Sequence, residues 1–491
     1  MNATGSRSPR RVVSAQTTGA RVLAANAIVV LGSGCAAWDI ETAIDDDLAR
    51  VTAAVAERTG FAVAPRGRAF ADAESSAELR LLLVAPLDEV AAVRVALLAN
   101  RSLEGAYEDI GVARADLVRA GLLSNPVIHG DAKLFASGTE FELGLTQSLL
   151  DLVFLATRER VSASRLEAAK ARLGATIVEV IAAVRRAHVD VRAAKRAREL
   201  AEDVTDSATE SRLLTERLYA AGNVTELALA TARANEARAR LDLARAELAG
   251  DEAREVLVAL LGLWGDDAAA VEVTEAFTLP DLPGDLERVE SRAVEASFEL
   301  AVAAAHVDAH AQQAGVARLE AILPQFDAGG FAKKDAGDAS FGLGPGGTIA
   351  LPVFDQGDAE DAAAHARLRR SLADHWRIAV EVRGVARRLR ARLVALCAVA
   401  EYEQSVYAPL EERVVEEVVR RYNAMQVGAF DVLAERRREL EAARAHVETL
   451  REAWHARIDL DALLAGAFAE PESLDGRSRA AERSDRGGPQ H

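Results

Sequence analysis

The sequence predicts a mainly α-helical protein with a small β part, built as a tandem duplication of units of about 200 residues. Three observations lead to this fold class. Half of the 491 residues are hydrophobic but only 4% are aromatic, so the apolar side chains are mostly the Ala, Val and Leu of long helices. Two stretches of about 70 residues, Leu149–Tyr219 and Asp355–Tyr422, contain only one proline, Pro409. The same order of elements also occurs twice along the chain.

Matched positions about 200 residues apart define the duplication. Tyr219 and Tyr422 precede similar turns, Ala-Ala-Gly-Asn-Val-Thr and Asn-Ala-Met-Gln-Val-Gly. Upstream, Asn125-Pro126 and Leu323-Pro324 each end a helical stretch. We therefore divide the chain into a signal peptide at 1–35, an N-terminal segment at 36–85, repeats at 86–283 and 284–469, and a disordered polar tail at 470–491.

Each repeat is expected to begin with a helix of about 35 residues, at Asp88–Ala120 and Asp285–Glu320. A proline shortly before each start favours these boundaries. Two short strands should follow in each repeat. In the first repeat, Phe141, Leu143 and Leu145 alternate with Glu or Gly, which is the period of a strand with one exposed face.

The second pair of strands is predicted from a similar pattern. Phe341 and Leu343 precede a Gly-Pro-Gly-Gly sequence, which we interpret as a turn. The segment Thr348–Leu351 after it has the composition of a strand. Each repeat thus contributes two short strands within a helical protein.

A long helix follows the strands in each repeat. At 1.5 Å per residue, Leu149–Tyr219 and Asp355–Tyr422 would each span roughly 100 Å. Pro409 should kink or locally unwind the second one. Matched lengths predict that the two long helices lie side by side, and helices of this length need coiled-coil neighbours.

A tight turn and a returning helix complete each repeat. The expected turns are Ala221–Asn223 and Gln426–Gly428, and the expected returning helices are Thr225–Leu263 and Phe430–Gly466. Within the first returning helix, Thr231–Leu248 is rich in alanine, which lets helices approach closely.

The N-terminus has the layout of an export signal. Four arginines between residues 7 and 21 precede the apolar stretch Val22–Leu31 and small residues around Cys35. The segment resembles a bacterial lipobox, which implies lipidation of Cys35. Ordinary cleavage nearby, with Cys35 lost or unmodified, is the alternative.

Composition and motifs exclude several functions. A net charge of -17 argues against a nucleic-acid partner, and two cysteines cannot form a disulfide framework. The chain lacks a His-Glu-x-x-His motif, a Gly-rich phosphate loop and a cysteine cluster, so we expect neither catalysis nor a cofactor. His306 and His310, with Asp308 between them, could hold a metal ion on one helix face. Surface histidines on an Ala-rich helix are the commoner case, and we assign no metal site.

Several motifs, in this order and spacing, resemble those of the TolC-type outer-membrane efflux channels. They are Asn100–Leu103, Leu122–Pro126, Ile349–Gly357 and the arginine-containing turns at Tyr219 and Tyr422. The resemblance covers about residues 80–467. It implies a homotrimer in which each protomer contributes four strands to a shared 12-stranded transmembrane β-barrel and its helices to a long periplasmic α-barrel. Lys333-Lys334-Asp335 would then lie in an extracellular loop.

The resemblance also implies two functional regions near the turns. One is a gate lined by carboxylates, which falls on Asp431 and, since Ala434 occupies the second family position, on Glu435. A helix-capping role for Asp431 is the structural alternative. The other region is a tip that faces an adaptor protein, formed by Tyr219, Gly222, Asn223, Tyr422 and Gly428.

The implied function is a passive exit duct in the bacterial outer membrane, with most of the chain in the periplasm. Its partners would be two further copies of the chain, a periplasmic adaptor, an inner-membrane pump and outer-membrane lipids. A periplasmic coiled-coil scaffold or adaptor is the alternative from another class, and a type I protein-secretion channel is the alternative within the family. The sequence does not distinguish drugs, metals, peptides or proteins as substrates.

Overall fold

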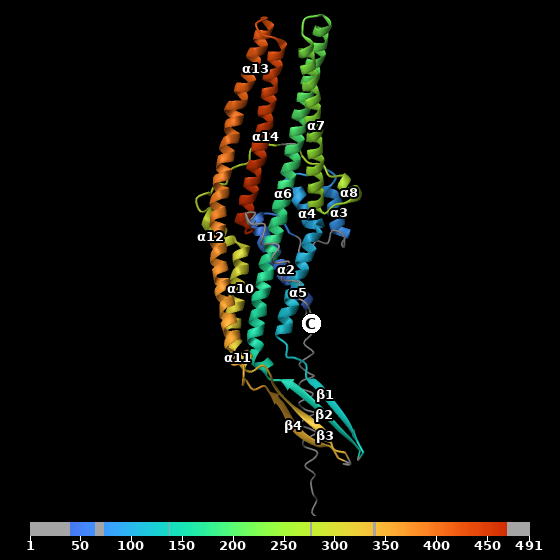
Figure 1. Ribbon diagram of the computed structural model, residues 1–491, viewed down its shortest axis with the longest axis vertical. Coiled ribbons are helices and arrows are strands. Elements are labelled where there is room, and N and C mark those ends of the chain that lie inside the picture. Colours follow the sequence, from blue (N-terminus) through green and yellow to red (C-terminus); the bar gives the residue numbers. More distant parts are fainter. Residues whose placement is uncertain (1–39, 64–72, 137, 275–276, 337–339, 469–491) are drawn as a thin grey trace, which may run out of the picture.

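The computed structural model of the chain describes residues 40–63, 73–136, 138–274, 277–336 and 340–468. The molecule is a long bundle of helices with a β-sheet at one end and two helical hairpin tips at the other (Figure 1). The predicted signal peptide with Cys35 and the predicted tail at 470–491 lie outside the described residues.

The first repeat contains two helices, a β-hairpin and a long helical hairpin. Its elements are α4 (Glu89–Ala99), α5 (Arg101–Ala120), β1 (Val127–Phe135), β2 (Gly138–Ser148), α6 (Leu150–Ala220) and α7 (Glu226–Leu261). The 71 residues of α6 and the 36 residues of α7 confirm the predicted long helix and its returning partner.

The second repeat has the same order with more interruptions. Its elements are α9 (Val289–Ala296), α10 (Phe298–Ala314), α11 (Ala317–Ile322), β3 (Phe326–Lys334), β4 (Gly342–Ile349), α12 (Asp358–Tyr402), α13 (Ala408–Asn423) and α14 (Ala429–Ala465). In the described part of the chain, α2 (Ile40–Thr59), α3 (Ala73–Leu82) and α8 (Gly265–Ala269) also lie around the middle of the bundle (Figure 1).

The prediction of one 35-residue helix at the start of each repeat is wrong. Asn100 separates α4 from α5, and Ser297 separates α9 from α10. Each of these residues has extended backbone and caps the next helix through its side chain. The Asn100 side chain accepts a hydrogen bond from the Ser102 N–H at 2.8 Å, and the Ser297 hydroxyl accepts one from the Leu300 N–H at 3.2 Å. Asn100 also donates to the Leu260 carbonyl at 2.7 Å, so a contact far along the chain holds the break.

A glycine packs against each of these breaks. Gly262 ends α7 with φ +74° and Gly466 ends α14 with φ +114°, both in the left-handed region. A Cβ on Gly262 would lie 2.4 Å from the Ala99 carbonyl oxygen, and a Cβ on Gly466 would lie 2.4 Å from that of Ala296. We call each contact between a helix break and this glycine a joint. The same joint occurs in both repeats, which supports the duplication at the level of single residues.

The effect predicted for Pro409 is confirmed. A π-helical turn, Glu403–Tyr407, joins α12 to α13 immediately before this proline. Proline lacks an N–H and its ring collides with the carbonyl one turn earlier, so a regular α-helix cannot pass through it without strain. A wider turn of the π type accommodates that mismatch.

The four strands form one antiparallel sheet in the order β1-β2-β3-β4. The interpretation of Gly344-Pro345-Gly346-Gly347 as a turn is wrong, because these residues lie within β4, opposite Gly330 and its neighbours in β3. β4 is an edge strand in this sheet, where proline is tolerated. The ring of Phe331 fills the space above the glycines, since a Cβ on Gly344 would lie 2.8 Å from it.

Lys333 and Lys334 also differ from expectation. They end β3 and pair with Glu142 and Phe141 of β2, so they belong to the sheet and not to the loop. The Lys333 ammonium lies 3.1 Å from the Glu140 carboxylate and 3.1 Å from that of Asp335. Lys333 is thus paired with carboxylates on both sides, and the Lys334 ammonium lies 5.8 Å from the centre of the Phe341 ring.

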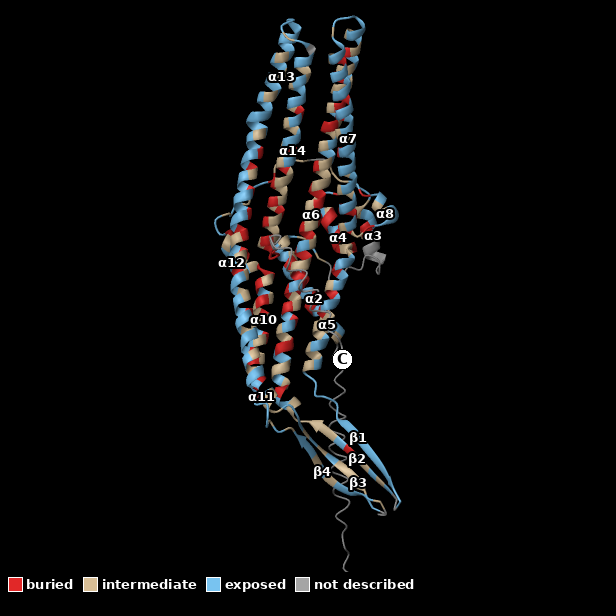
Figure 2. Ribbon diagram, viewed as in Figure 1, coloured by how far each residue is buried: buried red, intermediate tan, exposed pale blue. Residues whose placement is uncertain are grey.

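The core lies in the middle of the bundle (Figure 2). The larger buried cluster joins α2, α4, α5, α6 and α7, and a smaller one joins α9, α12 and α14. The expectation that α6 and α12 pack side by side is wrong, because α10 and α14 each contact both of them and lie between them. Equal length places two helices at one level but does not make them neighbours.

Candidate functional sites at the two ends of the molecule

The sheet has one apolar face and one polar face. Successive side chains of a strand point to opposite faces, and the register assigns each residue to one of them. The apolar face carries Ile128, Ala132, Leu134, Phe141, Leu143, Leu145, Phe326, Ala328, Ala332, Leu343, Pro345 and Ile349, with Thr139, Gln147 and Lys334 at its ends. The polar face carries His129, Asp131, Lys133, Glu140, Glu142, Thr146, Asp327, Lys333 and Thr348, with Val127, Phe135 and Phe331.

No other described part of the chain covers the apolar face. Leu134, Leu343 and Ile128 are 86%, 72% and 71% exposed. Contiguous apolar surface of this size marks a site of contact with a membrane or another protein. Strands of 8 to 11 residues also match the ~9–11 residues that a tilted strand needs to cross a bilayer. Among the described helices, none combines the length and apolar character needed for a membrane span.

The first tip joins α6 to α7 through Gly222, as predicted. Gly222 has φ +75°, and a Cβ there would meet nothing within 4 Å. The N–H of Gly222 donates to the Tyr219 carbonyl at 2.9 Å, and the N–H of Asn223 donates to the Leu218 carbonyl at 2.9 Å. Thr225 then caps α7 by accepting from the Ala228 N–H at 3.2 Å.

The second tip uses a different residue from the one predicted. Gly428 has φ −85°, so it needs none of glycine's conformational freedom, and the left-handed residue is Met425 with φ +57°. The N–H of Met425 donates to the Tyr422 carbonyl at 2.9 Å, as Gly222 does to Tyr219. The left-handed conformation costs a residue with a side chain about 1 kcal/mol or more. The alignment of the two turns on Tyr219 and Tyr422 places Met425 opposite Gly222, but the prediction gave the turn conformation to Gly428 because it is a glycine.

The predicted gate residues lie on the first turns of α14. Asp431 is exposed and accepts a hydrogen bond from the Gly428 N–H at 2.8 Å, which is the capping arrangement weighed as its alternative role. Glu435, one turn later, pairs with Arg438 at 2.8 Å. Asp431 and Glu435 lie on one face of α14, and neither lines the groove described next.

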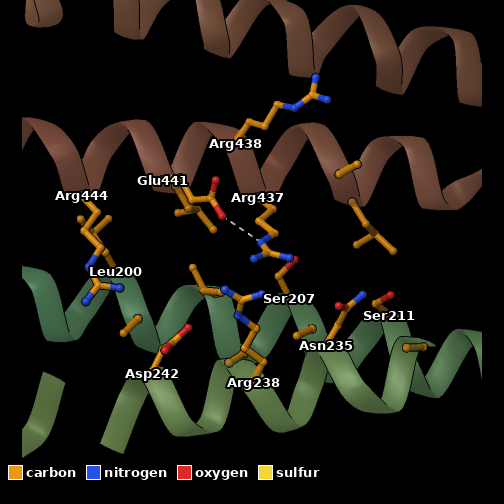
Figure 3. A pocket seen from close by; sticks show the side chains of 18 of the residues that line it. Leu200, Ser207, Ser211, Asn235, Arg238, Asp242, Arg437, Arg438, Glu441 and Arg444 are labelled. Atoms are coloured by element: carbon orange, nitrogen blue, oxygen red, sulfur yellow. Dashed lines mark hydrogen bonds and ion pairs between the residues drawn. The ribbon is translucent and has the colours of Figure 1, made fainter. Parts of the chain in front are cut away.

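A groove runs below the tips between the α6–α7 hairpin and α14 (Figure 3). Its upper part has a volume of about 610 Å³, and an adjoining part of about 710 Å³ shares Glu441 and Arg444 with it. The upper part is lined largely by apolar and small side chains: Leu200, Ala201, Val204, Ala208, Ala232, Ala239, Phe430, Leu433, Ala434 and Leu440. Sequence analysis missed this groove, because it exists only once α14 lies beside α6.

Arginines border the groove. Arg437 is bound to Glu441 at 3.0 Å (Figure 3). Within the described residues, neither Arg238 nor Arg444 forms an ion pair, although both line the groove. Their guanidinium groups are therefore available to carboxylates of a bound partner.

The two histidines considered for metal binding each contact another side chain. The His306 ring lies 2.8 Å from the Arg172 guanidinium, and burial together with this cation lowers the pKa of His306. His310 contacts Gln313 at 3.3 Å. No cluster of three or more metal-binding side chains occurs in the described parts of the chain.

Known proteins share this architecture. Residues 96–263 match the family model of the outer membrane efflux protein. No curated protein sequence matches the chain.

Several solved structures have the same fold. A membrane protein of Pseudomonas aeruginosa is 21% identical with a TM-score of 0.66, and the match covers 82% of this chain and 96% of that one. The outer membrane protein VceC of Vibrio cholerae is 19% identical with a TM-score of 0.66, over 80% and 97% of the two chains. The open MtrE outer membrane channel of Neisseria gonorrhoeae is 20% identical with a TM-score of 0.64, over 78% and 90%.

The fold is thus the fold of solved outer-membrane channel structures. Within this fold, the segment 96–263 is similar to the outer membrane efflux protein family, in agreement with the resemblance of the sequence motifs. The matched segment is essentially the first repeat, from α4 to the end of α7.

Proposed function

We propose that the chain is the outer-membrane exit duct of a tripartite efflux system, a passive channel that receives its substrates from an inner-membrane pump through a periplasmic adaptor. The observation that carries this proposal is the two-faced sheet. Its apolar face suits lipid and its polar face suits a water-filled lumen, and both faces belong to the same four strands. A periplasmic scaffold would have no use for an uncovered apolar sheet.

The same sheet argues for a homotrimer. β1 and β4 are edges, and their unpaired N–H and C=O groups cannot remain unsatisfied in the hydrocarbon region. Closing the sheet with copies of itself satisfies both edges. Three copies give a barrel of 12 strands, and the helical bundles then extend from it as a tube into the periplasm.

The opposite end supports adaptor docking. The tips lie farthest from the sheet, and the groove beside them has an apolar floor with the unpaired Arg238 and Arg444 on its sides. An amphipathic helix with carboxylates beside its apolar stripe is complementary to such a surface. Asp431 and Glu435, beside the groove, are the proposed gate, and their carboxylates would face the axis of the trimer.

Membrane fractionation and reconstitution test the proposal. We expect the protein in the outer-membrane fraction as a trimer in mild detergent, and we expect ion conductance after insertion into planar bilayers. Leu143→Asp places a charge on the apolar face and should impair insertion into the membrane, since a charge that faces lipid is unfavourable: Arg or Lys costs ~2–4 kcal/mol at the bilayer midplane, and a carboxylate costs somewhat less. The matched change Glu142→Asp on the polar face should leave insertion intact. A soluble monomer with no conductance would overturn the proposal.

A further inference from the structure

Met425 differs from every other residue of the two tips. Like Gly222 it has a left-handed backbone, but it also carries a large side chain, which is 94% exposed. The chain contains two methionines, and the other is Met1. A flexible apolar side chain thus stands in solvent at the end of the bundle, on a backbone conformation that favours glycine.

The first tip shows that folding does not require this side chain. Both tips make the same pair of backbone hydrogen bonds at 2.9 Å, with Gly222 at the position of Met425. Glycine adopts this conformation without strain. A side chain that is 94% exposed also gains almost nothing from burial. Within the single chain, the left-handed backbone of Met425 is therefore unfavourable, and its exposed side chain makes almost no compensating packing contact.

The surroundings of Met425 have the character of an interface core. The run Tyr422–Phe430 carries no charged residue, whereas 27% of the whole chain is charged. Tyr422 and Phe430, at the two ends of this run, are each 42% exposed. Depletion of charge together with enrichment of Tyr, Phe and Met is typical of the buried centre of a protein interface. Arg420, Arg421 and Asp431 lie outside the run, as rim residues would.

We propose that Met425 is the apolar anchor by which the second tip engages the adaptor, and that it enters an uncharged recess at the adaptor's end. This proposal rests on the proposed function. Methionine fits such a recess because its unbranched, polarizable side chain adapts to irregular apolar surfaces. Gly222 offers no side chain, so the two tips of one protomer are unequal. A trimer therefore has one anchor per protomer and not one per tip.

Photo-crosslinking in the native bacterium tests the contact. A photoreactive residue is placed at position 425 or at position 222 of the full chain, and adducts of the trimer are identified by mass spectrometry. We expect position 425 to yield at least about fivefold more adduct with one periplasmic adaptor than position 222. Equal yields at the two positions would overturn the inequality of the tips.

Substitutions separate an anchor from a structural residue. Met425→Gly removes the side chain and the strain together, so we expect thermal stability of the trimer to stay equal or rise while adaptor co-purification falls about fivefold or more. Met425→Gln, which has similar length but is polar, should lose adaptor to the same degree. Met425→Leu should retain it within about twofold. A loss of trimer stability in Met425→Gly would make the residue structural and overturn the proposal.

The exchange of side chains between the tips is the strictest control. Gly222→Met has room, because nothing lies within 4 Å of a Cβ there, and at φ +75° it takes on the backbone strain that Met425→Gly removes from the second tip. We expect the double variant Gly222→Met with Met425→Gly to remain as deficient as Met425→Gly alone. Wild-type adaptor binding by either variant overturns the anchor but leaves the duct intact. Absence of a trimer from the wild-type outer membrane would instead contradict the proposed function.

Discussion

The two repeats have the same joint but differ in their long helical hairpins, which we call the arms: α6–α7 in the first repeat and α12–α14 in the second. In both, a capped helix break receives the glycine that ends the returning helix, Gly262 against Ala99 and Gly466 against Ala296. Above the joints the hairpins diverge. α6 is a continuous helix of 71 residues, whereas a π-helical turn divides its counterpart into α12 and α13.

The two arms also differ in packing: the first has buried residues along its returning helix, and α13 of the second has none. Along α7, Ala232, Ala239 and Ala246 are buried at intervals of seven residues, the period of a coiled coil. Glu236 of the same seam is 8% exposed and binds Arg212 of α6 at 2.8 Å. α13 has no buried residue, and exposure dominates this arm in Figure 2.

The first hairpin is therefore closely packed, and the upper part of the second is loosely packed. The boundary is the π-helical turn, where Glu403 accepts from the Thr449 hydroxyl at 3.2 Å and contacts the His446 ring at 3.0 Å on α14. Below it, α12 contributes to a buried cluster, and above it α13 does not. A duplicated chain can thus combine one closely packed hairpin with one loosely packed hairpin.

The largest expected effect on stability comes from removing the charge of Asp47, which binds α2 to the first repeat. Asp47 is fully buried and meets Arg114 of α5 at 2.8 Å and Lys170 of α6 at 2.9 Å. Asp47→Asn removes the buried charge that Arg114 meets and leaves Lys170 paired with Glu167 alone, and we expect the free energy of unfolding to fall by about 3 kcal/mol. Thermal unfolding measures the loss, and hydrogen exchange should locate it in α5 and α6. Asp46→Asn, on the exposed face of the same helix, should change little.

The same residue predicts a pH dependence. Burial would raise the pKa of Asp47, but hydrogen bonds and charges from Lys170 and Arg114 outweigh it and hold the pKa below its ordinary value. The contribution of Asp47 is therefore fully present above the unfolded-state pKa of about 3.9 and is lost as the pH falls through the lower folded-state value. The gap in stability between wild type and Asp47→Asn should narrow below about pH 4. A gap that stays constant to pH 2 would contradict the ion-pair account.

Proline substitutions sharpen the contrast between the continuous and divided helices. Asp206 of α6 occupies the position that Pro409 has in the second repeat, and it is exposed. Asp206→Pro should cost about 3 kcal/mol, because α6 has no π turn to accommodate the ring. Pro409→Ala should cost nothing and can stabilise α13 by up to ~1 kcal/mol. Equal effects at the two sites would show that the arms do not differ in tolerance.

The joints, in contrast, should respond alike. Gly262→Ala and Gly466→Ala each place a Cβ 2.4 Å from a carbonyl oxygen on a left-handed backbone. We expect each to lower the free energy of unfolding by about 2 kcal/mol. Gly250→Ala is the control, since this helical glycine of α7 has nothing within 4 Å of a Cβ and should gain ~0.5–1 kcal/mol. A marked inequality between the two joints would break the symmetry that the structure indicates.

Sequence reasoning succeeded where local signals decide and failed where distant contacts do. The long helices and the π turn follow from the distribution of proline. The break at Asn100 depends on a hydrogen bond to Leu260, which no local pattern contains. The path of β4 depends on Phe331 filling the space over its glycines, so Gly-Pro-Gly-Gly resembled a turn. The groove depends on which helices become neighbours, and equal lengths suggested the wrong pair.

The last comparison is between the two tips, and we expect it to give the smallest effect. The tips differ in the charge of the side chain that caps the returning helix. Asp431 caps α14 through the Gly428 N–H, whereas α7 is capped by the uncharged Thr225 through the Ala228 N–H. Ala228 and Asp431 occupy equivalent positions when the tips are aligned on Tyr219 and Tyr422. The first tip therefore shows how to keep a capped helix without a carboxylate.

The double substitution Gly428→Thr with Asp431→Ala transfers that neutral cap to the second tip. If the three Asp431 carboxylates of a trimer converge at the gate, they attract multivalent cations, and their removal should weaken block from the periplasmic side roughly threefold or more at low salt. The difference should shrink as salt rises, because the exposed charges are screened. Stability should stay near wild type, since Thr supplies the cap that Asp431 supplied. Glu435→Gln should add little, because Glu435 is already paired with Arg438 at 2.8 Å. Unchanged block in planar bilayers, in a variant that is as stable as wild type, would place the constriction elsewhere and leave Asp431 with its capping role alone.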